Sequence, residues 1–338
     1  MRITRTGATL FTLAALSITL AQCSSSGGSG TVTPRPSGSA SASPSPSPSP
    51  ARPTSIFVGN FGGSTIPAFP ATGTGNLTPT TSITGGSTVL TPYLIYDDST
   101  GRIWSPNFSI PSVTAYAAGA TGNATPVVNL AGANAGFTHP AGVYVNAAGT
   151  AFVADPGNAS IRIFASGATG NVAPTTIISG ATTTLVQPAG IWLDGSANID
   201  VTDFTTAAID TFAPGASGNV APTRTITGAN TLLSSPLGLA LDAAGNMYVG
   251  NVGAPNVLVF AAGSSGNATP SRVIAGANTM ISFPAGVAVD ASGYIYVADA
   301  NAAAVLVFAP GATGNVAPVQ VISGSNTGFN GLRGIAIR

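Results

Sequence analysis

The chain has 338 residues with ten Lys plus Arg and ten Asp plus Glu, and every cation is Arg and every anion Asp. The formal net charge is zero and no run of arginine stands out, so binding to the phosphate backbone of nucleic acid is not expected. The helix-favouring residues Lys and Glu are missing, whereas Gly, Pro, Thr, Val and Ile abound, which favours an all-β domain.

The N-terminus has the composition of an export signal. Arg2 and Arg5 precede an apolar run over residues 8–21, a length and flank that predict a signal peptide over residues 1–22 rather than a transmembrane anchor. A Ser/Gly/Pro-rich stretch over residues 23–54 follows, and it carries too few apolar residues to form a core. We expect it to be a disordered tether to a domain that covers residues 55–338.

The single cysteine, Cys23, stands at the end of the apolar run. Its surroundings, "LAQCSSS", resemble a bacterial lipoprotein lipobox, which implies a lipid on Cys23 and a place at the cell envelope, in the outer membrane or at the cell surface. Gln22 departs from that motif, which prefers Gly, Ala or Ser there. The alternative is ordinary cleavage after Ala21, which would release a soluble periplasmic or extracellular protein. An internal disulfide is excluded.

A short motif recurs along the rest of the chain. The string "APGATGNVAP" at 309–318 has close copies at 165–174 and 213–222 and weaker ones elsewhere. Its Gly-Asn pair begins at positions 75, 122, 170, 218, 266 and 314, so the period is 47 or 48 residues. A fixed period of this length indicates a propeller or solenoid.

One repeat contains four short strands. In residues 284–324, runs rich in Val, Ile, Tyr and Ala cover 286–290, 294–299, 304–309 and 319–323, with turn residues between them. We name these strands a, b, c and d. Four antiparallel strands per repeat predict the blade of a β-propeller.

The strand counts predict how the ring closes. Strands b and c each have six copies, but the first copy lacks strand a, and a lone strand a, "GIAIR", forms residues 334–338. We therefore predict a six-bladed β-propeller with 3+1 closure, in which the C-terminal strand completes the N-terminal blade and leaves no free edge.

Two segments, "PAGVAVDASGYIYVADANAAAVLVFA" and "PLGLALDAAGNMYVGNVGAPNVLVFA", resemble NHL repeats. The resemblance covers residues 55–338, with a degenerate copy at "YLIYDDSTGRIWSPN", and it implies the same six-bladed fold. It says little about activity, because propellers host binding modules, lyases and lactonases.

Residues present in every repeat are interpreted as scaffold. An Asp or Asn closes each a–b turn, at positions 98, 146, 194, 242 and 290, and we expect it to cap that turn. A second series at the ends of the b strands, at positions 60, 107, 155, 203, 251 and 299, fits local Asx-turns equally well. The Gly-Asn motif is interpreted as a structural c–d loop.

Departures from the repeat give the candidate ligand-binding residues. Tyr93 and Arg333 hold the position between Pro and Gly before strand a, where other repeats have Ala or Leu; this suits an anionic or sugar-like group. The alternative is that Arg333 pairs with a carboxylate near the closure. His139, the only histidine, precedes Pro140 and is a third candidate. Gluconolactonase-type propellers carry metal-binding Asn and Asp at these positions, and none stands here, so we expect neither a metal nor another cofactor.

Two further departures concern buried positions. Asp200 replaces the aromatic residue that other repeats have in strand b, and the hairpin register places Trp192 opposite it, so that large and small residues exchange places. Arg162 and Asp210 hold equivalent positions in the c strands of adjacent blades, and we expect an inter-blade ion pair between them.

No catalytic residues can be assembled from the sequence with a Cys–His or Ser–His–Asp pattern. The prediction is a monomeric, non-catalytic binding module whose partner is a protein, glycan or small molecule, and which contacts the membrane through its lipid alone. The alternatives are a lyase or lactonase-like enzyme that uses His139, Tyr93 or Asp200, and a structural or adhesive surface protein that uses its c–d loops.

Overall fold

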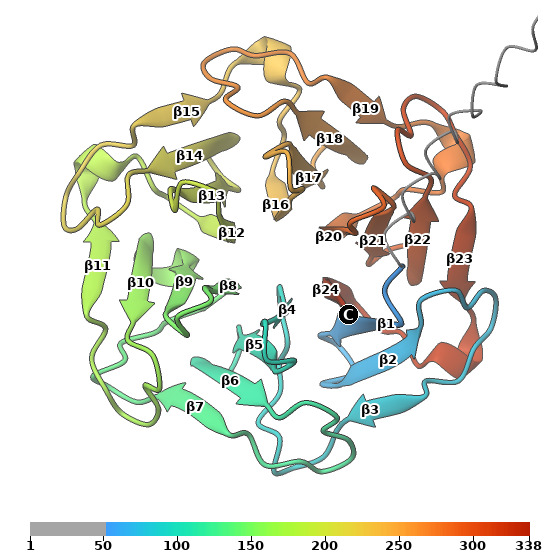
Figure 1. Cartoon of the computed structure of the whole chain (residues 1–338), viewed down its shortest axis with the longest axis horizontal. Coiled ribbons are helices and arrows are strands. Elements are labelled where there is room, and N and C mark those ends of the chain that lie inside the picture. Colours follow the sequence, from blue (N-terminus) through green and yellow to red (C-terminus); the bar gives the residue numbers. More distant parts are fainter. Residues whose placement is uncertain (1–51) are drawn as a thin grey trace, which may run out of the picture. The chain divides into compact units, whose positions relative to one another are not determined.

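The computed structural model describes residues 52–338, and these form six four-stranded antiparallel sheets arranged in a ring (Figure 1). The predicted six-bladed β-propeller is confirmed. The predicted signal peptide, Cys23 and nearly all of the predicted tether lie outside the described residues. Within residues 52–338, no helix is long and apolar enough to cross a membrane.

Each blade is numbered in chain order, and its strands run from a at the channel to d at the rim. Blade 1 comprises β24 (Leu332–Ile337), β1 (Ser55–Asn60), β2 (Ile66–Pro70) and β3 (Thr81–Ile83). Blade 2 comprises β4 (Tyr96–Asp97), β5 (Ile103–Asn107), β6 (Ser112–Tyr116) and β7 (Val128–Ala131). Blade 3 comprises β8 (Gly142–Val145), β9 (Ala151–Asp155), β10 (Ser160–Phe164) and β11 (Thr176–Ser179).

The other three blades follow the same plan. Blade 4 comprises β12 (Pro188–Leu193), β13 (Ile199–Asp203), β14 (Ala208–Phe212) and β15 (Arg224–Ile226). Blade 5 comprises β16 (Pro236–Leu241), β17 (Met247–Asn251), β18 (Asn256–Phe260) and β19 (Arg272–Ile274). Blade 6 comprises β20 (Pro284–Val289), β21 (Ile295–Asp299), β22 (Ala304–Phe308) and β23 (Gln320–Ser323). The loops of the described region contain five short 3-10 helices, η1 (Pro156–Asn158), η2 (Ala181–Thr183), η3 (Ala229–Thr231), η4 (Ala277–Thr279) and η5 (Ser325–Thr327).

The ring closes as the strand counts predict. Strand β24 pairs antiparallel with β1, with Ile337 opposite Ile56 and Gly334 opposite Gly59. The inner edge of blade 1 is therefore covered by the C-terminal strand, which removes the unpaired backbone groups that an open edge would present.

Strand a of blade 2 is much shorter than its equivalents. Pro106 in β5 stands where blade 3 has Ala154, and proline has no N–H to donate to a neighbouring strand. Its carbonyl still accepts the N–H of Tyr93 at 3.0 Å, but regular pairing is confined to Tyr96 with Trp104 and Asp97 with Ile103.

The Gly-Asn motif of each c–d loop joins its blade to the preceding one. The N–H of Gly218 donates to the Ile177 carbonyl at 2.7 Å, and the N–H of Ser179 donates back to the Gly218 carbonyl at 3.1 Å. The Asn219 side chain accepts the N–H of Thr182 at 2.7 Å. The same parallel bridge occurs at all six positions, with Gly75, Gly122, Gly170, Gly218, Gly266 and Gly314. We call this arrangement the inter-blade clasp, and it explains why the motif repeats.

The core lies between the blades, and each c strand buries one aromatic side chain in it completely. These six residues are Phe69, Tyr116, Phe164, Phe212, Phe260 and Phe308. The large aromatic area that they remove from water makes them the main apolar contribution to each blade interface.

The repeated Asp and Asn residues are structural. The side chain of Asp194 accepts the N–H groups of Ser196 and Asn198 at 2.8 and 2.9 Å, which confirms the predicted turn cap. Burial raises the pKa of Asp194, but the hydrogen bonds from Asn198 and Ser196 outweigh it, so its pKa is lowered.

The Asp and Asn residues at the ends of the b strands make contacts beyond the predicted local turns. Asp155 accepts the N–H groups of Thr138 and His139, in the loop that enters strand a, at 3.1 and 2.9 Å. Asp203 and Asp299 bond to the equivalent loops in their blades. These residues therefore fix the d–a loops that surround one end of the channel.

The chain enters the ring at Arg52. Its guanidinium donates to the Tyr296 hydroxyl at 3.0 Å and lies 4.0 Å from the centre of the Tyr294 ring, next to the a–b turn of blade 6. Arg52 and Thr54 thus contact the propeller although they precede the predicted boundary at residue 55. Because b strands begin at the a–b turns and end at the d–a loops, this entry lies on the face opposite the d–a loops.

Candidate functional site

The b–c and d–a loops form one face of the ring, which we call the mouth. Tyr93 lies in the loop before β4, and Arg333 is the second residue of β24, in the adjacent blade. The structure brings these two predicted residues together, with the Arg333 guanidinium carbon 5.8 Å from the centre of the Tyr93 ring.

Arg333 is held among aromatic rings and has no carboxylate partner in the described part of the chain. Its guanidinium also lies 5.9 Å from the Phe61 ring and 5.1 Å from the Phe283 ring. Its Nε is buried without a hydrogen-bond partner, and its one hydrogen bond is a long one of 3.4 Å to the carbonyl of Leu332. The arginine that does pair near the closure is Arg338, 2.6 Å from Asp97. The alternative of a paired Arg333 is therefore wrong.

An arc of aromatic side chains continues from Tyr93 around the mouth. Tyr93 stacks on Phe108 with ring centres 4.9 Å apart, and Phe61 meets Tyr93 edge-on at 6.1 Å. Phe108 in turn lies 4.9 Å from the His139 ring. All three predicted residues thus belong to one surface that extends from Phe283 to His139.

The sequence reasoning missed Phe61, Phe108 and Phe283. Phe61 and Phe108 directly follow the Asn that ends strand b, where other blades have Pro156, Phe204, Val252 and Ala300. That position is a signal that could have found Phe61 and Phe108, because the residue after each b strand leads into a b–c loop at the mouth. Burial raises the pKa of Tyr93, and the nearby charge of Arg333 acts in the opposite direction.

His139 lacks the partners of a general base. Its backbone N–H, not its ring, bonds to Asp155, and that carboxylate also receives the N–H of Thr138, the Asn158 amide and Arg162. No carboxylate of residues 52–338 orients the imidazole, which rests against Phe108. The same part of the chain contains no group of three or more His, Cys, Asp or Glu side chains that could hold a metal ion.

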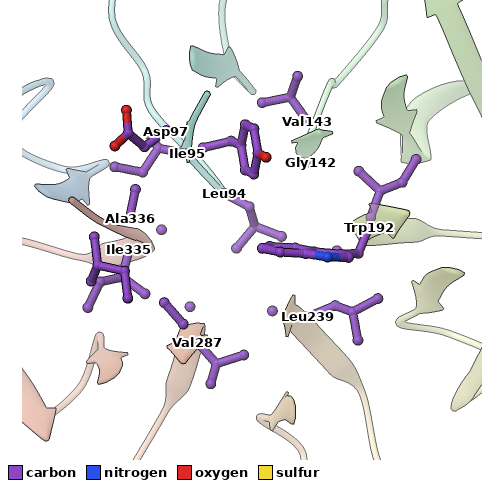
Figure 2. A pocket seen from close by; sticks show the side chains of 18 of the residues that line it. Leu94, Ile95, Asp97, Gly142, Val143, Trp192, Leu239, Val287, Ile335 and Ala336 are labelled. Atoms are coloured by element: carbon purple, nitrogen blue, oxygen red, sulfur yellow. The ribbon is translucent and has the colours of Figure 1, made fainter. Parts of the chain in front are cut away.

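The floor of the mouth is apolar and is closed by Leu94. The third residue of the entry to strand a is glycine in five blades, in the sequence Pro-x-Gly in four of them and Leu-Arg-Gly in blade 1, whereas blade 2 has Leu94. We call these five residues, Gly142, Gly190, Gly238, Gly286 and Gly334, the glycine layer. Leu94 packs with Ala189, Leu237 and Ala285 on the mouth side. It also lines the pocket on the other side of this layer, where Figure 2 shows it near the middle of the view.

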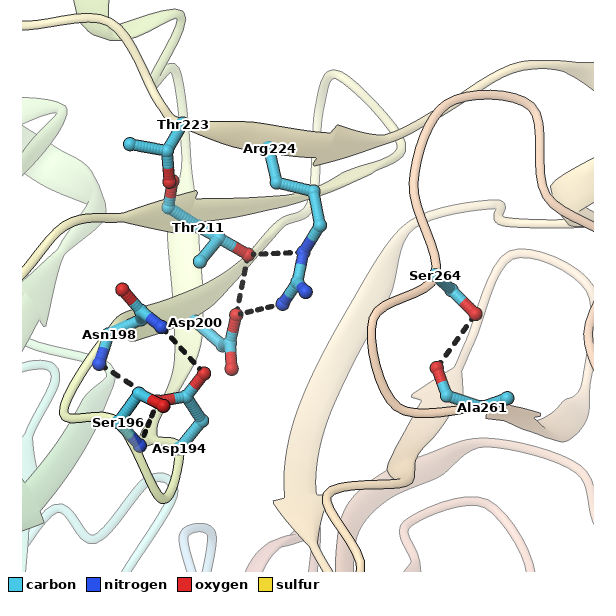
Figure 3. A network of polar contacts seen from close by, with 9 residues as sticks. All are labelled: Asp194, Ser196, Asn198, Asp200, Thr211, Thr223, Arg224, Ala261 and Ser264. Carbon is cyan, nitrogen blue, oxygen red and sulfur yellow. Dashed lines mark hydrogen bonds and ion pairs between the residues drawn. The ribbon is translucent and has the colours of Figure 1, made fainter.

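The predicted register around Asp200 is confirmed, with Trp192 opposite Asp200. Asp200 is fully buried, and one of its oxygens accepts from the Thr211 hydroxyl at 2.5 Å and from Arg224 at 3.2 Å (Figure 3). Its other oxygen has no hydrogen-bond partner among residues 52–338. Burial raises the pKa of Asp200 to about 6, against the Thr211 hydrogen bond and the Arg224 charge. The residues that bond to Asp200 both belong to its own blade, and we assign it no substrate.

The predicted ion pair between Arg162 and Asp210 is wrong. Arg162 pairs with Asp155 of its own blade at 3.3 Å, because that carboxylate lies on the neighbouring strand of the same sheet. Asp210 instead accepts hydrogen bonds from Thr225 at 2.6 Å and Thr184 at 3.3 Å.

No protein-family model and no curated protein matches the sequence. Solved structures match most of the ring. A protein of unknown function from Bacteroides caccae has a TM-score of 0.60 at 14% identity, over 85% of this chain and 99% of that chain. A structure of a nidogen/laminin complex has a TM-score of 0.57 at 17% identity, over 84% and 97%.

An inactive variant of virginiamycin B lyase from Staphylococcus aureus, solved with quinupristin, has a TM-score of 0.53 at 12% identity, over 79% and 81% of the two chains. At these identities the likeness shows the propeller fold and does not extend to function.

Proposed function

We propose that this propeller is a non-catalytic binding module of NHL-repeat type, whose mouth takes an anionic group carried on a ring, such as an acidic sugar. The observation that carries the proposal is Arg333, a partly buried cation whose Nε has no hydrogen-bond partner within residues 52–338. Its guanidinium carbon lies 5.1 to 5.9 Å from the centres of three aromatic rings. Removing a cation from water without a counter-ion is unfavourable, so an anionic ligand supplies the missing partner.

The aromatic arc supports the second half of the proposal. The rings of Tyr93 and Phe61 lie next to the guanidinium, and Phe108 extends this surface by stacking on Tyr93. Aromatic surfaces of this kind suit the apolar face of a sugar ring. A uronic acid residue offers both groups, a carboxylate that can pair with Arg333 and a sugar ring that can pack against Tyr93.

Isothermal titration calorimetry with oligogalacturonate tests this function. We expect saturable binding to the wild type, at least a tenfold loss in Arg333→Gln and in Tyr93→Ala, and no change in Arg102→Gln, which removes the same charge from an exposed position. Equal binding by all four proteins would overturn the mouth as the site. Turnover of the ligand that disappears in His139→Ala would replace the binding module with an enzyme.

We also propose export and lipid attachment at Cys23, on the basis of the signal sequence and the lipobox-like residues before it. Labelling with radioactive palmitate in a bacterial host tests this directly. Label that is incorporated by the wild type and absent from Cys23→Ala would support a lipoprotein, whereas an unlabelled, soluble wild type would support simple cleavage after Ala21.

A further inference from the structure

On the side of Leu94 that faces away from the mouth, the channel holds a separate pocket of about 100 Å³. It runs along the a strands from the glycine layer toward the a–b turns, where Val289 and Ile337 are only half-buried and leave it accessible to solvent. Neither Tyr93 nor Arg333 lines it, so it is independent of the mouth.

The a strands in the two halves of the ring carry unlike side chains at the level of this pocket. At one level of the a strands, blades 2, 3 and 4 carry Tyr96, Tyr144 and Trp192, whereas blades 5, 6 and 1 carry Ala240, Ala288 and Ala336. The three aromatic rings lie in mutual contact, with centres 4.9 to 5.7 Å apart. Of these six residues, four line the pocket: Tyr96 and Trp192, which we call the aromatic wall, and Ala288 and Ala336, which we call the alanine wall. Each of these alanines lies opposite an aromatic residue of strand b in its own blade, and its short side chain takes little of the pocket.

Trp192 presents a flat surface to this space. In Figure 2 its indole is seen edge-on, reaching from β12 to the neighbourhood of Leu94, with Val287 and Leu239 across the gap. Among the described residues nothing accepts a hydrogen bond from its Nε1, in contrast to Trp104, whose Nε1 donates to Asp98 at 2.7 Å.

The polar groups of the pocket are few and occupied. The charge of Asp97 is paired with that of Arg338, 2.6 Å away. The Tyr96 hydroxyl lies against Tyr144, and its pKa is raised mainly by burial and then by Tyr144. The other lining side chains are aliphatic. A charged ligand would lose its hydration here without compensation, and a sugar would leave most of its hydroxyls unpaired.

We propose that this pocket is a second binding site, for an uncharged planar ring that stacks on the indole of Trp192. The volume suits a single ring of benzene size, since apolar cavities of on the order of 100–150 Å³ hold such molecules in proteins. The aromatic wall supplies the stacking surface and the alanine wall supplies the room.

Tryptophan fluorescence tests the site, because the chain has two tryptophans and Trp104→Phe leaves Trp192 as the single emitter. The probe is nitrobenzene, an uncharged planar ring that quenches indole on contact. We expect saturable quenching with a midpoint of about 0.1–1 mM, as befits a ligand of nine heavy atoms. Acrylamide, which does not stack, should quench without saturation.

Variants separate this pocket from other surfaces. Ala336→Leu, made in the Trp104→Phe background, fills the alanine wall and should weaken nitrobenzene quenching at least tenfold. Leu232→Ala, at an exposed apolar residue of another loop, and Arg333→Met, at the mouth, should leave it unchanged. If Ala336→Leu does not fold, Ala288→Val tests the same wall. Quenching that does not saturate, or that survives both filling variants, would overturn the proposal.

Discussion

The side chain of Asn76 accepts a hydrogen bond from the backbone N–H of Asn326 at 2.7 Å, across 250 positions of sequence. Together with the parallel bridge between Gly75 and Ile322, it forms the clasp that joins blade 1 to blade 6. The ring is therefore closed twice, by β24 on β1 at the channel and by this clasp at the rim.

The clasp at the closure is expected to stabilise the whole ring. Asn76→Ala should lower the free energy of unfolding by about 1–2 kcal/mol, the cost of leaving one backbone donor without its partner. Asn219→Ala removes the equivalent bond between two blades that the chain also connects directly, and it should cost a similar amount in urea unfolding. In Asn76→Ala alone, hydrogen exchange of the β1 and β24 amides should also accelerate; identical exchange in both variants would contradict the double closure.

Neighbouring a strands approach each other so closely at the glycine layer that a side chain there would collide with the next strand. A Cβ on Gly238 would lie 2.6 Å from the carbonyl oxygen of Ala285 and 2.9 Å from the nitrogen of Val287, both backbone atoms that cannot move alone. Gly238→Ala should therefore destabilise the protein by about 2–3 kcal/mol. Gly195→Ala, with nothing within 4 Å, should change the melting temperature little. Equal stability of the two variants would show that the a strands can separate freely.

Asp200 should make stability depend on pH in an unusual direction. Its pKa in the folded chain, about 6, exceeds the ordinary 3.8, so its favourable contribution is complete below pH 4 and is lost as the pH rises through 6. The stability of the wild type relative to Asp200→Asn should thus increase by on the order of 2 kcal/mol from pH 7.5 to pH 4.

A matched control for this pH effect is Asp194→Asn. The pKa of Asp194 is lowered, so the wild type should lose stability relative to this variant as the pH falls. Urea unfolding at four pH values measures both differences. Two differences of the same sign would show that the pKa of the Asp200 carboxyl is not raised in the folded protein.

Arg333 should contribute to binding at the expense of stability. Arg333→Met removes a partly desolvated cation while keeping the packing against Phe61 and Phe283, so we expect stability to rise by about 1 kcal/mol or stay unchanged. Arg338→Met breaks the pair with Asp97 and should lower stability by about 1–3 kcal/mol. Thermal unfolding compares the two; a clear loss in Arg333→Met would mean that the cation has an intramolecular structural role.

The fold was largely predictable because a repeated sequence displays its own alignment. Comparison of the copies was enough to find four strands, the 3+1 closure and the Trp192–Asp200 register, which all depend on spacing within one repeat. Contacts between repeats were not predictable in the same way. The partner of each Gly-Asn loop lies in another blade. Arg162 pairs with Asp155 of its own sheet instead of the expected Asp210 of the next blade.

The candidate site was only partly visible for the same reason. Tyr93 and Arg333 stand out because they break a column of small residues in the sequence. Phe61 and Phe108 occupy a column that also contains Phe204, Pro156, Val252 and Ala300, so they become distinctive only when the ring places them beside Tyr93. The two walls of the Trp192 pocket also require the ring, since they arise from which blades are neighbours.

The entry of the chain at Arg52 distinguishes the two faces of the ring. Both Arg52 and the C-terminal Arg338 lie on the face of the a–b turns, since the N–H of Thr54 bonds to the carbonyl of Arg338 at 2.5 Å. An affinity tag or sensor surface joined next to Arg52 or Arg338 is attached on the face of the Trp192 pocket, opposite the face that carries Arg333. Immobilisation through the termini should accordingly leave the mouth open to macromolecules and crowd the pocket, which makes the two sites distinguishable by the geometry of attachment alone.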